Sequence, residues 1–236
     1  MPTGDPRHHP SPVLLMRAGV LLGMLAALAA VTSRTDGGWL SDVDARITSL
    51  VARRRNTAVI RAAHAASALA EPGVAAAPLA AAALLAVRRD GWHAAFRPCL
   101  TVIAGMTVRR GLSRMIARPR PPAANWLIEP EGFSLPSKHT TLAALTAGAC
   151  ALSLGARRPA RDRAVIMAAA SVGASRIYLG VHWPTDVLAG WLLAAAWLDL
   201  DGLALRCAQP PDSTGQVSAL RLHLTKQTRR RPRGTT

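Results

Sequence analysis

His182 and Asp186 are the residues of this sequence whose types and spacing most directly suit chemistry. Pro184 lies between them and suits the first position of a helix, so Asp186 is expected in the first helical turn. The carboxylate can then reach one imidazole nitrogen, fix the tautomer of the ring and support positive charge on it. The other nitrogen stays free to attack an electrophile, so the pair predicts a histidine nucleophile; a purely structural pair is the alternative.

Two arginines, Arg118 and Arg120, alternate with prolines in the segment 117–122. Proline fixes its own backbone and restricts the residue before it, so both arginines are expected to project from a stiff turn. A guanidinium group binds two phosphate oxygens side by side, which makes this turn a candidate phosphate site. Taken alone, the segment is also typical of a basic loop that flanks a membrane span.

A third candidate segment, Ser137, Lys138 and His139, opens an apolar stretch. Ser137 suits the N-cap of a helix, and the free N–H groups of a first helical turn bind anions. His139 in that turn can donate a proton to a leaving oxygen. An ordinary helix cap beside an interfacial histidine is the alternative interpretation of this segment.

Long apolar stretches must position these three segments. Half of the residues are hydrophobic, and a helix of ~20 apolar residues crosses a ~30 Å hydrocarbon core. We therefore predict an all-α fold, a polytopic membrane helix bundle with about six transmembrane helices. The expected spans are 13–32, 72–87, 94–107, 139–154, 164–178 and 184–205. The first span also fits a cleaved signal peptide, which is the alternative for that stretch.

The segment 39–70 differs from these spans because charged residues interleave with apolar ones at near-helical spacing. This pattern predicts an amphipathic helix in the membrane interface that runs into an alanine-rich helix. Arg61 argues against a full span, since an arginine in mid-membrane costs ~2.5–3.5 kcal/mol. The expected organisation is a tail over 1–12, a membrane-embedded domain over 13–206 and a basic tail over 207–236.

The formal net charge of +16 is concentrated in short clusters and in the C-terminal tail. The arginine clusters in 88–92 and 156–163 are typical of cytoplasmic loops, which predicts a multi-pass protein of the cell membrane. The same topology brings 114–138 and 180–183 together on the extracytoplasmic face. Few aromatic residues accompany the basic ones, which argues against a nucleic-acid partner. The three cysteines lack metal-ligand spacing and are expected to be small buried hydrophobic residues.

With these residues the chain resembles the type 2 phosphatidic acid phosphatase superfamily, which also contains the vanadium haloperoxidases. The third motif of that family, Ser-Arg, five residues, His, three residues, Asp, is complete from Ser175-Arg176 to Asp186. The second motif, Pro-Ser-Gly-His, reads Pro136-Ser137-Lys138-His139. The first motif, lysine, six residues, Arg-Pro, ends in Arg120-Pro121 but has Ser113 in the lysine position.

The resemblance implies that His182 attacks phosphorus and forms a phosphohistidine, while Asp186 orients the ring. It further implies that His139 protonates the leaving oxygen and that no metal or other cofactor is needed. The predicted phosphate-binding residues are Arg120, Arg176, Ser137, Lys138, Arg118 and Arg114. Arg110, Arg114 and Lys138 are the candidates to supply the positive charge that Ser113 lacks.

The expected activity is hydrolysis of a lipid phosphate or pyrophosphate. A polyprenyl pyrophosphate is favoured, with phosphatidate or phosphatidylglycerophosphate as alternatives. The expected partners are this substrate and membrane lipids, and the sequence indicates no oligomeric state. Two other functions are alternatives: vanadate-dependent haloperoxidase chemistry, and non-catalytic binding of a lipid phosphate by a membrane protein with a degenerate first motif.

Overall fold

The computed structural model describes residues 11–32, 38–153 and 159–208, and within these ranges the secondary structure is entirely helical. The predicted tails, 1–12 and 207–236, therefore lie almost wholly outside the described residues. The elements are α1 (Pro12–Thr32), α2 (Trp39–Arg53), α3 (Thr57–Ala68), α4 (Pro72–Asp90), η2 (Trp92–Ala95), α5 (Phe96–Ile116), η3 (Ala123–Asn125), α6 (Lys138–Ser153), α7 (Pro159–Tyr178) and α8 (Pro184–Ala208).

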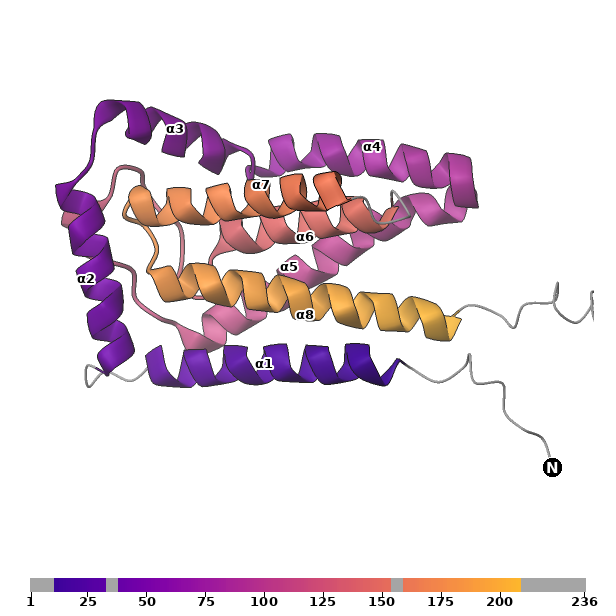
Figure 1. Ribbon diagram of the computed structural model, residues 1–236, viewed down its shortest axis with the longest axis horizontal. Coiled ribbons are helices and arrows are strands. Elements are labelled where there is room, and N and C mark those ends of the chain that lie inside the picture. Colours follow the sequence, from indigo (N-terminus) through magenta and orange to yellow (C-terminus); the bar gives the residue numbers. More distant parts are fainter. Residues whose placement is uncertain (1–10, 33–37, 154–158, 209–236) are drawn as a thin grey trace, which may run out of the picture.

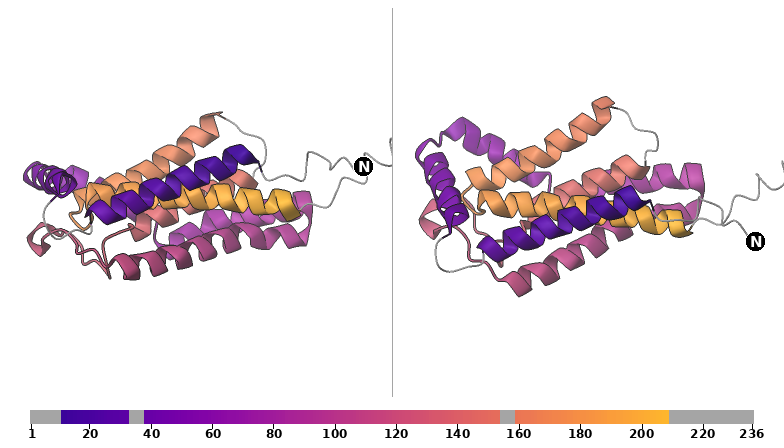
Figure 2. Two further views of the ribbon diagram at one scale, coloured as in Figure 1. Left: turned by 90° about the horizontal axis from the view of Figure 1, so that it is seen from below. Right: turned by 60° about the horizontal axis from the view of Figure 1, so that its bottom comes forward.

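Six long helices, α1 and α4 to α8, run along the length of an elongated bundle, and α2 crosses one end of it (Figure 1). Helix α8 packs against α1 on one side and α6 on the other, and α6 also contacts α4, α5 and α7. The further views show α1 lying beside α8 along most of its length (Figure 2). The all-α bundle predicted from the apolar stretches is confirmed.

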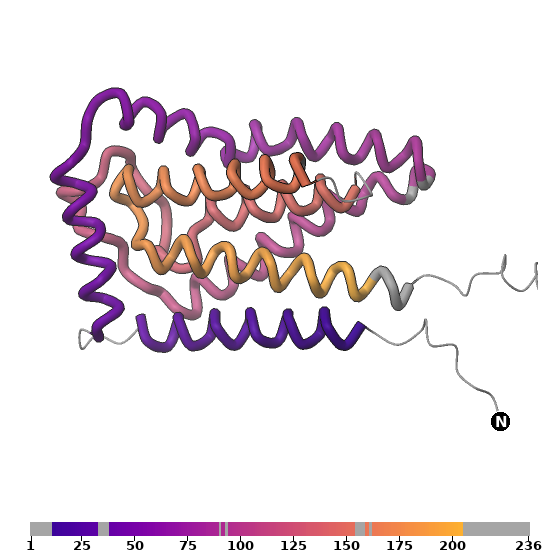
Figure 3. Tube along the Cα trace, viewed as in Figure 1, coloured from indigo at the N-terminus to yellow at the C-terminus, as the bar shows by residue number. Residues whose placement is uncertain are grey.

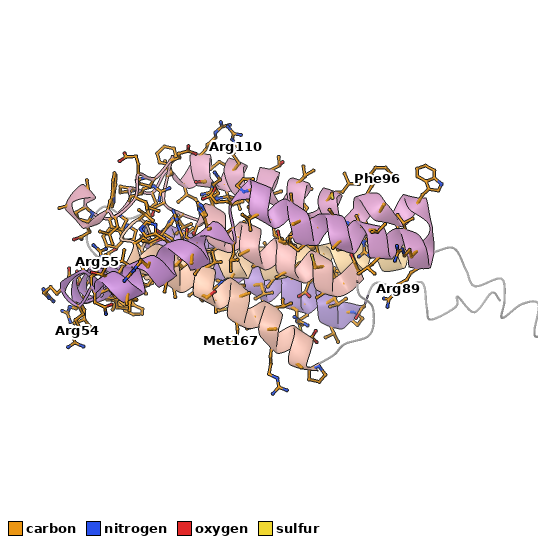
Figure 4. The ribbon with its side chains drawn as sticks, turned by 90° about the horizontal axis from the view of Figure 1, so that it is seen from above. Arg54, Arg55, Arg89, Phe96, Arg110 and Met167 are labelled. Carbon is orange, nitrogen blue, oxygen red and sulfur yellow. The ribbon has the colours of Figure 1, made fainter. Side chains whose placement is uncertain are left out.

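Among the described residues, three helices are long and apolar enough to cross a membrane: α1, α4 and α8. The remaining long helices, α5, α6 and α7, lie alongside these and correspond to the other three predicted spans. Large apolar side chains on α5 and α7 face outward, including Ile103 at 62% and Met167 at 67% exposure, and Met167 points away from the bundle (Figure 4). An apolar exterior of this kind suits a lipid environment.

Small residues allow the long helices to approach one another closely. A Cβ atom added to Gly105 on α5 would lie 2.7 Å from Leu145 on α6, and one on Gly173 of α7 would lie 2.6 Å from Val187 on α8. Glycine contacts between helices are typical of membrane bundles, where backbone proximity and van der Waals packing replace the hydrophobic effect.

The segment 39–70 forms two helices, α2 and α3, as its helical spacing predicted. Asn56 caps α3, because its side-chain oxygen accepts a hydrogen bond from the backbone N–H of Val59 at 2.9 Å. Asp44 of α2 is fully buried and does not face the membrane interface that was predicted for this segment. Its burial shows that α2 packs over the end of the bundle. The trace in Figure 3 places the loop between α5 and α6 and the turn between α7 and α8 at this same end.

Candidate active site

His182 lies in the short connection between α7 and α8. Residues from other parts of the chain, Arg55 and Asn125, hold the backbone of this connection in place. Gly180 adopts a left-handed conformation with φ of 80°, and a Cβ there would collide with the carbonyl oxygen of Asn125. Arg55 donates from Nε to the carbonyl of Tyr178 at 3.0 Å and from Nη2 to that of Asn125 at 2.8 Å. These contacts hold the chain just before His182, whose side chain is 1% exposed.

The hydrogen bonds of His182 fix its tautomer. Its Nε2 lies 3.2 Å from Nη1 of Arg120. A guanidinium can only donate, so Nε2 is the accepting, unprotonated nitrogen. The proton is therefore on Nδ1, which lies 3.4 Å from Oδ2 of Asp186. Nε2 therefore carries the lone pair that a histidine nucleophile requires, and attack on a substrate requires Arg120 to release this hydrogen bond.

Asp186 is itself held in place on both of its carboxylate oxygens. Oδ2 accepts from the backbone N–H of Trp183 at 2.8 Å and from the hydroxyl of Ser134. Oδ1 accepts from Nη1 of Arg118 at 2.7 Å. Because the carboxylate is fully buried and multiply bonded, its orientation toward His182 is determined by the surrounding fold.

Arg118 has a different place from the one predicted. From the sequence it is expected to bind phosphate, but its Nη1 donates to Asp186 and Thr185, and its Nη2 donates to Asp44 at 2.8 Å. Its side chain is buried and does not line the cavity at His182. The local sequence gives Arg118 and Arg120 similar surroundings, and Asp44, which draws Arg118 inward, comes from α2.

A cavity of about 400 Å³ opens at His182. Five of the predicted site residues line it: His182, His139, Arg120, Arg176 and Lys138. Arg120 reaches it from the loop after α5, where its guanidinium also donates to the carbonyls of Val181, Gly132 and Glu131. The cavity thus brings together two histidines and three cationic side chains of the predicted set. Its lining also includes His64 and the carboxylates of Glu71, Glu129 and Glu131.

Arg176 approaches the cavity from α7 and is 3% exposed. Its Nη1 donates to the hydroxyl of Ser67 on α3 at 2.7 Å, while its Nε is buried with no hydrogen-bond partner in the described part of the chain. A buried guanidinium donor without a partner costs free energy unless an anion completes its bonding. The environment of Arg176 therefore suits a phosphate oxygen.

His139 faces the same cavity from the first turn of α6. Its Nε2 lies 3.0 Å from a carboxylate oxygen of Glu71, the residue before α4. The hydrogen bond to His139 lowers the pKa of Glu71, which keeps this carboxylate ionised. Glu71, Ser67 and Asp44 were not identified from the sequence, because each contacts its partner across a long sequence separation and none lies in a recognisable motif.

Two other predicted residues lie outside the cavity at His182. Ser137 is buried just before α6, where its hydroxyl accepts from Thr140 and its backbone N–H donates to the carbonyl of Asp186. Arg114 is exposed on α5 and lines a neighbouring cavity. Ser137 therefore supports the backbone of the site, and neither side chain is placed beside His182.

The charge state of His182 follows from its surroundings. Burial lowers the pKa of His182 to about 4, since the ring loses hydration when it is charged. The hydrogen bond and charge of Asp186 oppose this effect, while Arg120 and Arg176 add to it. The ring is neutral at neutral pH, which is the state that can attack. Within the described residues, no group of three or more His, Cys, Asp or Glu side chains is arranged to hold a metal ion.

Comparison with known proteins agrees with this architecture. Residues 94–200 match the PAP2 superfamily. An undecaprenyl-diphosphatase of Sulfolobus acidocaldarius is 36% identical over 87 residues, which make up 36% of this chain and 40% of that protein. The chain thus spans less than half the length of this relative.

Two solved structures share the fold. The transmembrane PAP2 type phosphatidylglycerolphosphate phosphatase from Bacillus subtilis has a TM-score of 0.71 and 23% identity, covering 79% of this chain and 94% of its own. Aquifex aeolicus LpxE has a TM-score of 0.55 and 21% identity, covering 66% of this chain and 92% of its own. The match over residues 94–200 covers a little under half of the chain, and over this part the chain is similar to the PAP2 superfamily.

Proposed function

We propose that this chain is a membrane phosphatase that removes phosphate from a lipid phosphate or pyrophosphate through a phosphohistidine at Nε2 of His182. The observation that supports this most directly is the bonding of His182. Its Nδ1 faces Asp186, and its Nε2 faces Arg120 at the cavity that also contains Arg176. A neutral, oriented nucleophile beside two guanidinium groups suits attack on phosphorus.

In the first step, Nε2 of His182 forms a bond to phosphorus as the bond from phosphorus to the leaving oxygen breaks. His139 starts this step in its protonated form, which the ionised Glu71 beside its Nε2 stabilises. It donates a proton to that oxygen and becomes neutral, so the lipid leaves as an alcohol or as a lipid monophosphate. Asp186 stabilises the positive charge that develops on the His182 ring. Arg120 and Arg176 donate to the equatorial phosphate oxygens, where charge must be balanced in the transition state.

In the second step, water attacks phosphorus and the nitrogen–phosphorus bond breaks. His139, now neutral, accepts a proton from the water, and His182 returns to its starting state. Inorganic phosphate leaves. Each proton and each phosphoryl transfer is assigned to a side chain of this chain, and we propose that no metal ion takes part.

For the substrate, we favour a polyprenyl pyrophosphate, as the name of the Sulfolobus relative suggests. Phosphatidylglycerophosphate and phosphatidate are the alternatives, and the first is the substrate class in the name of the Bacillus subtilis protein. We place the site on the extracytoplasmic face of a six-span, multi-pass protein of the cell membrane. Cytoplasmic loops are normally the more basic ones, and the charge of Arg120 on the opposite face then has a separate reason, which is phosphate binding.

The test is phosphate release by the purified protein in detergent, from a polyprenyl pyrophosphate and from phosphatidate, with EDTA present. His182→Ala is expected to abolish release. The control His223→Ala, which changes a histidine of the predicted C-terminal tail over 207–236, is expected to keep it. Brief reaction with ³²P-labelled substrate is expected to label the wild-type protein through an acid-labile, base-stable bond. Release that persists in His182→Ala would contradict the mechanism. Binding without release by the wild-type protein would favour the non-catalytic lipid-phosphate binder.

A further inference from the structure

A second cavity, of about 660 Å³, lies next to the one at His182. Lys138 and Glu131 line both, so the two cavities share a wall. The new lining residues come mainly from the last turns of α5 and include Arg109, Arg110, Ser113 and Arg114. Among the residues that line the second cavity, Lys138 and Arg114 were predicted to bind phosphate, and Arg110 was a further candidate for the charge that Ser113 lacks. Arg109 was not identified from the sequence.

The charge of the second cavity is strongly positive. Arg109, Arg110, Arg114 and Lys138 contribute four cationic groups, against one carboxylate, Glu131. The side chain of Glu131 is 89% exposed and lies 3.7 Å from Lys138, so it neutralises little of the charge on α5. Four cations around one cavity repel one another unless an anion binds between them, which makes the cavity a candidate anion site.

The shape of the cavity depends on Ser113. This residue is 4% exposed and stands where the first family motif has a lysine. Its short side chain leaves room that a lysine would fill. Arg109, four residues earlier, lies on the same helical face and is also buried. Its Nε donates to the carbonyl of Pro136 at 2.7 Å, which fixes the guanidinium close to the start of α6.

The position of the second cavity matches the side from which a leaving group departs. His139, the proposed acid, adjoins Lys138 in the first turn of α6, and Lys138 opens onto both cavities. Met106 and the exposed Phe133 add apolar surface to the lining. Arg110 projects from α5 at the edge of the bundle, far along the helix from Phe96 (Figure 4). A lipid can therefore lie along α5 with its anionic group between these arginines.

We infer that the second cavity binds a second phosphoryl group carried by the leaving group. This inference rests on the proposed function, because it assumes that the first phosphate is transferred to His182. The substrate class that uses both cavities has two phosphates on one lipid, joined directly as in a pyrophosphate or through a glycerol. A lipid with one phosphate, such as phosphatidate, leaves the second cavity without its anion.

The first test is binding, which does not depend on turnover. Isothermal titration calorimetry of the full chain in detergent measures the affinity for two probes. Methylenediphosphonate, a non-hydrolysable pyrophosphate analogue, carries two phosphonate groups, and methylphosphonate carries one. The wild-type protein is expected to bind the diphosphonate more tightly. Arg110→Gln/Arg114→Gln is expected to weaken diphosphonate binding about tenfold and methylphosphonate binding less than threefold, since two charge-assisted contacts are removed.

The control is Arg46→Gln/Arg53→Gln, which removes two exposed arginines from α2 at the same end of the bundle. It is expected to leave the preference for diphosphonate unchanged. The inference would be overturned if Arg110→Gln/Arg114→Gln, the α5 variant, bound both probes equally more weakly or bound neither more weakly. An equal loss of preference for the diphosphonate in the α2 control would also overturn it. Equal affinity of the wild-type protein for both probes would overturn it as well.

The second test compares lipids that carry two phosphates with a lipid that carries one. With a polyprenyl pyrophosphate, phosphatidylglycerophosphate and phosphatidate, the α5 variant is expected to lower kcat/KM about tenfold only for lipids that use the second cavity. The lipid that shows the loss identifies how the two phosphates are joined. A loss shared equally by phosphatidate would overturn the inference. If the binding result holds but the wild-type protein releases no phosphate, the proposed function fails while the second anion site stands.

Discussion

Asp44 of α2 and Asp186 of α8 bind the same guanidinium group. Nη2 of Arg118 donates to Asp44 at 2.8 Å and Nη1 donates to Asp186 at 2.7 Å, and all three side chains are buried. Thr185 joins them, since its backbone N–H donates to Asp44 at 3.1 Å. The carboxylate that faces Nδ1 of His182 is thus connected to α2, so the helix across the end of the bundle helps to position the proposed nucleophile.

The first prediction concerns Arg118. Replacement by Gln leaves two buried carboxylates without their shared cation, which is expected to cost about 3–5 kcal/mol in the free energy of unfolding. Chemical unfolding in mixed micelles measures the loss. Arg46→Gln, which removes an exposed arginine from α2, is the control and is expected to change stability by no more than about 0.5 kcal/mol. If Arg118→Gln is as stable as this control, the buried ion pairs are not formed in solution.

The second prediction concerns Asp186. Asp186→Asn keeps the size of the side chain but removes the charge that stabilises the imidazolium and holds the Nδ1 proton. By analogy with the equivalent change in a serine protease triad, kcat is expected to fall about 10³- to 10⁴-fold. KM is expected to change little, because Asp186 does not line the cavity. Steady-state kinetics provide the measurement, with Asp42→Asn on the exposed face of α2 as control. A variant with nearly normal kcat would exclude the orienting role.

The third prediction is a pH dependence. Burial lowers the pKa of His182 to about 4, against an ordinary value near 6.5. Between these two values the unfolded chain binds more protons at this histidine than the folded chain. His182 therefore makes the free energy of unfolding decrease as the pH falls from about 6.5 to about 4. In nitrogen NMR of histidine-labelled protein, the resonances assigned to His182 by their loss in His182→Gln are expected to titrate with a midpoint near 4. A midpoint at or above 6.5 for these His182 resonances would contradict this environment.

The sequence predicted those parts of the fold and site that depend on local spacing. The turn of α8 that carries Asp186 follows from Pro184, and the four-residue interval then brings its carboxylate to His182. The long helices follow from the apolar stretches in the same way. Arg118 shows the limit of this reasoning, since only a partner 74 residues away distinguishes it from Arg120.

Contacts between distant helices were also beyond local reasoning. The bond from His139 to Glu71 joins residues 68 positions apart, and the bond from Arg176 to Ser67 joins residues 109 positions apart. Neither Glu71 nor Ser67 differs in its sequence neighbourhood from many other polar residues near a helix end. Their roles arise because α3 and the start of α4 pack over α6 and α7, which helical periodicity does not determine.

The last prediction concerns Gly180, two residues before His182. A Cβ at this position would meet both the Asn125 carbonyl and the Arg55 guanidinium, and its φ of 80° is unfavourable for any other residue type. Gly180→Ala is therefore expected to displace Arg55 and Asn125 from their contacts with the connection between α7 and α8. The variant is expected to have lower stability and lower kcat, with a stability loss of at least ~1–2 kcal/mol from the backbone alone.

The matched control is Gly202→Ala in α8, where an added Cβ meets nothing within 4 Å. This variant is expected to be stabilised by roughly 0.5–1 kcal/mol, because alanine favours the helix. Unfolding in mixed micelles and phosphate release from the same preparations give the two readouts. A loss of stability in Gly180→Ala together with a gain in Gly202→Ala would support close contacts of Arg55 and Asn125 at Gly180. If Gly180→Ala keeps full stability and activity, a Cβ at this position does not collide with Asn125 or Arg55. The position of His182 then does not depend on the contacts of these two residues.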